Sequence, residues 1–161
     1  MADVSIYVAI ITALAGLTGA AVPVVASAIR DVRQSEQDRR ERWATATRDA
    51  CVDLLRAAGE LRTLSESIAA YRGTANGMRA RVDEVRDRAE ATRLSAANVS
   101  LQVAVLAEPA YQVASAADKL VQAVVEGTDM DRGVFVGELN VGKLVERVTA
   151  FREEAVKYAR G

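Results

Sequence analysis

Residues 61–85, "LRTLSESIAAYRGTANGMRARVDEV", place a short glycine-containing turn between two apolar repeats. On both sides of the turn, apolar residues recur at alternating spacings of three and four, which is typical of a helix that buries one face. A single threonine interrupts each repeat. The first repeat is Trp43, Thr47, Ala50, Leu54, Ala57, Leu61, Leu64, Ile68 and Tyr71, and the second is Met78, Val82, Val85, Ala89, Thr92, Ala96, Val99, Val103 and Leu106.

The two repeats are equal in length and flank the turn, as an antiparallel, coiled-coil-like helical hairpin requires. Because their ends match, we expect position i to face about position 149 minus i. Tyr71 then meets Met78 beside the turn, and Trp43 lies near Leu106 at the open end.

Two shorter helices are expected to follow the hairpin. Pro109 has no N–H to donate and favours the start of a helix, which then carries Val113, Ala117, Leu120 and Val124. The glycine-rich residues 127–142 break the periodicity and predict a loop. A last helix then buries Leu144, Val148, Phe151, Ala155 and Tyr158. Because no run of alternating β-branched residues occurs, we predict an all-α bundle.

The third and last helices are too short to cover a hairpin of this length along its whole extent. One consequence is an exposed hairpin tip, which would offer a surface for a partner or for self-association. The alternative is that the last helix swings over and covers the tip. The tip residues are Leu64, Ile68, Tyr71, Met78, Val82 and Val85.

The opening segment, residues 4–29, contains no charged residue. As a helix it would be about 39 Å long, enough to cross the roughly 30 Å hydrocarbon layer of a membrane. A cleaved signal peptide is disfavoured, because "MAD" supplies no basic residue and the apolar run is too long. Small residues near one face could pack a second membrane helix. They are Ala9, Ala13, Gly16 and Ala20.

Charges after this segment set the expected orientation. Arginines are concentrated in residues 30–42, whereas only the α-amino group and Asp3 precede the span. The positive-inside rule then places the N-terminus outside and the remainder in the cytoplasm. We therefore expect three parts in a bacterial inner-membrane protein with a single span: a transmembrane anchor at 1–29, a charged helical stalk at 30–42 and a cytoplasmic helical bundle at 43–161.

Composition argues against most kinds of catalytic site. The chain has no histidine and one cysteine, Cys51, so histidine-dependent catalysis and zinc clusters lack their residues. We expect Cys51 to be a small buried thiol. Asp83, Glu84 and Asp87 stand among arginines at ion-pair spacing. Asp129 and Asp131 lack the other ligands of a calcium loop. We expect no catalysis, no cofactor and no metal.

The balanced charge and scarce aromatic residues also predict no nucleic-acid binding. The remaining hypothesis is a membrane-anchored scaffold or adaptor whose partner is a protein or a second copy. Two alternatives stay open. One is an envelope-spanning protein with the bundle outside the cytoplasm, loosely similar to single-span coiled-coil proteins of phage lysis. The other is a soluble helical oligomer in which the opening helix belongs to the core.

Overall fold

The computed structural model describes residues 3–160, with side chains described from residue 34 to residue 160. Its helices are α1 (Asp3–Ala69), α2 (Ala75–Gln102), the short 3₁₀ helix η1 (Ala104–Leu106), α3 (Ala107–Glu126) and α4 (Gly142–Arg160). Two short strands, β1 (Thr128–Asp129) and β2 (Val134–Phe135), lie between α3 and α4. The predicted all-α class is confirmed.

The chain divides into two compact units, residues 1–45 and residues 46–161. In the first unit, α1 is helical from Asp3 onward, and every side chain from 34 to 45 is exposed. No helix in the described part of the chain is long and apolar enough to cross a membrane. The predicted span at 4–29, with its packing residues Ala9, Ala13, Gly16 and Ala20, lies outside the residues whose side chains are described.

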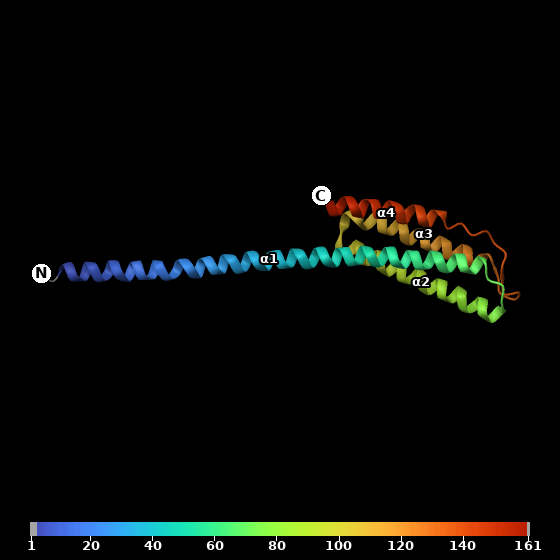
Figure 1. The fold of residues 1–161 in the computed structure, drawn as a ribbon, viewed down its shortest axis with the longest axis horizontal. Coiled ribbons are helices and arrows are strands. Elements are labelled where there is room, and N and C mark those ends of the chain that lie inside the picture. Colours follow the sequence, from blue (N-terminus) through green and yellow to red (C-terminus); the bar gives the residue numbers. More distant parts are fainter. Residues whose placement is uncertain (1–2, 161) are drawn as a thin grey trace. The chain divides into compact units, whose positions relative to one another are not determined.

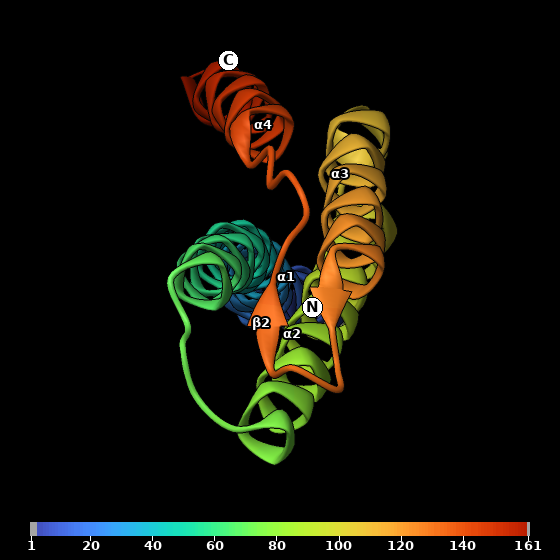
Figure 2. The same ribbon diagram turned by 90° about the vertical axis from the view of Figure 1, so that its right-hand side faces the viewer.

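In the second unit, the C-terminal part of α1 packs with α2, α3 and α4 in up-down-up-down order (Figures 1 and 2). The predicted hairpin is present. The Arg88 guanidinium donates to Glu60 at 2.7 Å, and Arg81 donates to the Ser67 hydroxyl at 3.2 Å. Each pair lies one residue from the predicted register, so these contacts confirm the antiparallel pairing of α1 with α2.

Local chemistry sets both ends of α2. Thr74 has an extended backbone, and its hydroxyl accepts from the Gly77 N–H at 3.1 Å, which caps the first turn. At the other end, Val103 is extended and its N–H bonds the Val99 carbonyl. Helix α3 then begins two residues before Pro109, where proline costs no helical hydrogen bond. The predicted third helix is confirmed.

Burial follows the second repeat closely and the first repeat only in part. All nine residues of the second repeat are buried. In α1, burial begins at Thr47, because Trp43 is 48% exposed. Further along, Ala58 and Ser65 are buried, whereas Ala57 and Leu64 are only half-buried. A straight helix of 3.6 residues per turn drifts from a strict heptad, and α1 shows this drift.

The segment between α3 and α4 departs from the prediction of a plain loop. Strands β1 and β2 pair antiparallel, with Thr128 opposite Phe135, and Val134 also bridges to Arg72 beside the hairpin turn. Gly133 has φ of 64°, and a Cβ there would lie 2.7 Å from backbone atoms of Thr74 and Ala75. Only glycine allows this close approach. The β-hairpin therefore lies directly against the turn between α1 and α2.

This contact contradicts the expectation of an exposed hairpin tip. Four of its six residues, Ile68, Met78, Val82 and Val85, are fully buried, while Leu64 and Tyr71 are half-buried. The α3–α4 segment, and not α4 swinging over, contacts the turn. The expectation of an exposed tip is therefore wrong, because residues 127–142 contain a β-hairpin that packs against the turn.

Candidate interaction surface

Of the three carboxylates on α2 that stand among arginines, Asp83 is engaged in a surface ion pair, 3.1 Å from Arg86. Glu90 of the same helix forms another, 2.6 Å from Arg93. Among residues 34–160, no three histidine, cysteine, aspartate or glutamate side chains gather in a way that could hold a metal ion. These helix faces therefore carry the chemistry of a solvated surface.

The aspartates between α3 and α4 serve the local turn. Asp129 accepts from the N–H groups of Asp131 at 3.1 Å and Arg132 at 3.0 Å, which is the pattern of an Asx turn. The Arg132 guanidinium lies 3.5 Å from the same carboxylate. Asp131 lies 4.0 Å from Arg79 of α2. Asp129 therefore shapes the turn of the β-hairpin, and Asp131 makes only a long, exposed ion pair with α2.

Cys51 lies half-buried on α1 beside Ala50. Burial raises the pKa of its thiol, because a thiolate would lose hydration there. The thiol is therefore protonated at neutral pH and is a poor nucleophile.

Arginines of α2 also connect the helices of the bundle. Arg88 pairs with Glu60 of α1 at 2.7 Å, and Arg93 pairs with Asp118 of α3 at 2.7 Å. The hydrogen bond to Asp118 raises the pKa of Arg93. All of these side chains are about half-exposed, so each pair adds little stability and mainly sets the packing of its helices.

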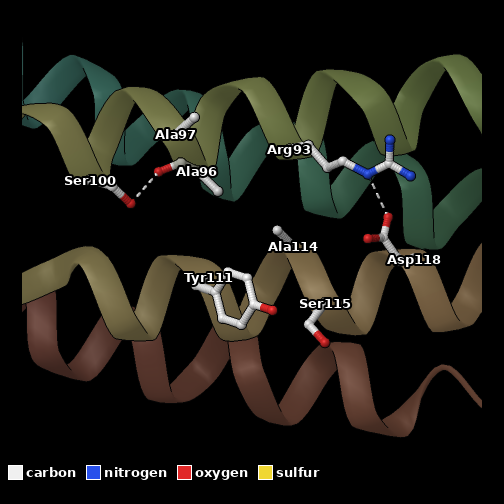
Figure 3. A pocket seen from close by; sticks show the side chains of 8 residues that line it. All are labelled: Arg93, Ala96, Ala97, Ser100, Tyr111, Ala114, Ser115 and Asp118. Atoms are coloured by element: carbon white, nitrogen blue, oxygen red, sulfur yellow. Dashed lines mark hydrogen bonds and ion pairs between the residues drawn. The ribbon is translucent and has the colours of Figure 1, made fainter.

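A groove of about 290 Å³ runs between α2 and α3 (Figure 3). The Arg93–Asp118 ion pair closes one end, and Ser100 and Tyr111 stand at the other. Between them the walls carry only small side chains. The lining residues are Arg93, Ala96, Ala97, Ser100, Tyr111, Ala114, Ser115 and Asp118.

A second groove, of about 550 Å³, lies between α1 and α2. Its floor includes Gly59, where an added Cβ would meet no atom within 4 Å. Four charged side chains border this groove: Arg56, Glu60, Glu84 and Arg88. Glu60 and Arg88 pair across this groove, as Arg93 and Asp118 do at the groove between α2 and α3.

The outward side of α2 carries large apolar side chains. Leu94 is 63% exposed and Leu101 is 87% exposed, and Val105 of the following turn is 72% exposed. Leu94, Ala97 and Leu101 are spaced three and four residues apart, so they share one side of the helix. We call Leu94, Ala97, Leu101 and Val105 the outer face. Tyr111, 64% exposed, stands beside it at the mouth of the groove.

Sequence reasoning missed this outer face, because it used the same segment only for its buried repeat. A signal was present in the charge pattern. Residues 94–107, "LSAANVSLQVAVLA", contain no charged side chain, while residues 79–93 contain nine. A buried face needs only every third or fourth residue to be uncharged, so a run of this length indicates that a second face is apolar too.

No family model, curated protein or solved structure matches this chain. A function must therefore be argued from the site itself.

Proposed function

We propose that this protein is a membrane-anchored helical scaffold or adaptor that works by protein contact or self-association and catalyses no reaction. The observation that carries the proposal is the outer face of α2. Exposed apolar side chains that gather beside a groove mark interaction surfaces, whereas single exposed leucines are ordinary.

The membrane part of the proposal rests on the sequence. Residues 4–29 are uncharged, and a helix of that length, about 39 Å, exceeds the roughly 30 Å apolar layer. Basic residues are concentrated directly after the segment, in residues 30–42, which favours an outside N-terminus and a cytoplasmic bundle in a bacterial inner membrane. The span would fix the location, and the bundle would present the surface.

The absence of catalysis is supported by the residue types. Without histidine, a general base near neutral pH would need a carboxylate or a thiol with a suitably shifted pKa. Burial raises the pKa of the one thiol, Cys51, whereas a nucleophilic thiol needs a lowered pKa. Asp83 and Glu90 face arginine partners on their own helix.

Fractionation of the full-length chain in a bacterial host tests the proposal. We expect the protein to stay in the membrane pellet after alkaline carbonate extraction. A C-terminal tag should be protected from protease in spheroplasts and cleaved after lysis. The matched control is Leu14→Arg with Leu17→Arg, which should release the protein, since each central arginine costs about 2.5–3.5 kcal/mol on insertion.

The other outcomes are equally definite. Protein of the parent sequence in the soluble fraction would refute the anchor and favour a soluble oligomer with the opening helix in its core. A tag that protease removes from intact spheroplasts would place the bundle outside the cytoplasm and favour the envelope-spanning alternative.

A further inference from the structure

We infer that the outer face of α2 is an antiparallel interface between two copies of this chain, with Leu101 of each copy seated in the α2–α3 groove of the other. The inference rests on the proposed function, because it names the partner of that surface. It follows from three features of the described residues: shape, spacing and charge.

The first feature is shape. The surface carries both a protruding side chain and a hollow that is lined by small ones. Leu101 is the most exposed large apolar residue of the described chain. The groove beside it is walled by Ala96, Ala97 and Ala114. A two-fold interface needs one patch that is complementary to itself, and a knob next to a hole on the same patch provides this.

The second feature is spacing. Ala97 borders the groove, and Leu101 lies one helical turn further along the same side of α2. When two such helices run antiparallel around a two-fold axis near residue 99, Leu101 of each copy lies opposite Ala97 of the other. Leu94 then faces the η1 turn that carries Val105. All the residues of the outer face are covered in this single arrangement.

The third feature is charge, which selects the antiparallel direction. Asp83, Asp87 and Glu90 continue the outer face toward the N-terminus of α2 at the same spacing. A parallel pair would place these carboxylates beside their own copies, which is unfavourable. The antiparallel pair sets the uncharged residues 94–107 of both copies against each other and moves the two acidic segments to opposite ends.

The same charges disfavour a lipid surface as the occupant. Faces that lie on membranes usually combine apolar side chains with lysine or arginine, which contact anionic head groups. Here residues 94–107 contain no basic residue, and the nearest one, Arg93, is already paired with Glu90 and Asp118. A groove with defined walls also fits a shaped side chain better than fluid acyl chains.

Cysteine cross-linking of the full-length protein tests the geometry. In a Cys51→Ser background, Asn98→Cys places a thiol next to the predicted axis, and Asp83→Cys places one on the same side of α2 but far from it. We expect mild oxidation to cross-link N98C chains into dimers and to leave D83C chains monomeric. Cross-linking of both variants would show a parallel pair, and cross-linking of neither would refute the interface.

Sedimentation of the full-length protein, in mild detergent where the membrane requires it, tests the energetics. Leu101→Glu should raise the dimer dissociation constant about tenfold or more, as expected for a central apolar contact. Val136→Glu is the matched control, because Val136 is also well exposed but lies in the segment after β2. It should leave dimerisation unchanged.

The outcomes separate this inference from the proposed function. If the protein is membrane-bound and the L101E variant dimerises as well as the parent, the proposed scaffold function stands and the α2 interface is refuted. A membrane-bound chain that stays monomeric at all concentrations also refutes it. Finally, N98C that resists a water-soluble thiol reagent even at one chain per lipid vesicle would place this face on lipid, which overturns the inference.

Discussion

Replacement of Thr47 by valine should stabilise the protein. Thr47 is the polar exception in the first apolar repeat and is 6% exposed. Its hydroxyl oxygen is buried and has no hydrogen-bond partner within the described residues. Valine has nearly the same shape and carries a methyl group in place of the hydroxyl. The substitution therefore removes an unsatisfied polar group without opening a cavity.

The expected size follows from the cost of that group. Burial of a hydroxyl without a partner costs about 1–3 kcal/mol in proteins. We therefore expect Thr47→Val to raise the free energy of unfolding by about 1–3 kcal/mol. For a unit of this size, each kcal/mol raises the midpoint temperature by about 4 °C.

Thr92 provides the matched control in the second repeat. It is also buried, but its hydroxyl donates to the Arg88 carbonyl at 2.8 Å. Thr92→Val gives up a hydrogen bond worth about 0.5–1.5 kcal/mol, so its gain should be smaller. Urea unfolding of the full-length chain, followed by far-ultraviolet circular dichroism, gives both values. The reasoning fails if Thr47→Val is no more stable than Thr92→Val, or is less stable than the parent.

Three further predictions follow from single contacts. Thr74→Ala removes the cap of α2 and should cost about 1 kcal/mol in urea unfolding, whereas Thr74→Ser should keep most of it; equal midpoints for all three chains would contradict the cap. Phe151→Ala empties a fully buried site of α4 and should cost about 3–5 kcal/mol, with faster amide hydrogen exchange across residues 142–160; unchanged exchange would count against this packing. Burial raises the pKa of Cys51, so its thiol should react with an aromatic disulfide reagent more slowly in the folded chain than in urea. For the same reason, stability should fall as pH rises above the ordinary thiol pKa, and Cys51→Ala should lack that fall; equal rates in both states would argue against burial.

The hairpin could be predicted because its two repeats are long, regular and matched around one turn. Burial of the second repeat from Met78 to Leu106 is complete. In α1, the heptad spacing wrongly predicts full burial of Ala57 and Leu64. A strict heptad assumes that two helices supercoil around each other. Helix α1 is covered by more than one neighbour in the bundle, so its buried side follows the 3.6-residue period instead.

The covering of the hairpin tip could not be predicted from periodicity. Strands β1 and β2 are two residues each, which is too short for any alternation to appear. Their position depends on close backbone contacts at Gly127, Gly133 and Gly137. A sequence pattern marks such glycines as turn residues, but it does not say which distant backbone they approach.

Helix α2 has two apolar faces with the same periodicity, one buried and one exposed. The apolar residues of both faces recur at spacings of three and four, so periodicity alone predicts the buried face and does not reveal the exposed one. What distinguishes the second half of α2 is the loss of charge on the side that faces away from the core. Solvent exposure of Leu101 gains nothing for the fold of a single chain, and a charged residue would serve solubility better at that position. An apolar residue there makes physical sense if another surface covers it, and the adjacent small-walled groove indicates that the other surface carries the same leucine.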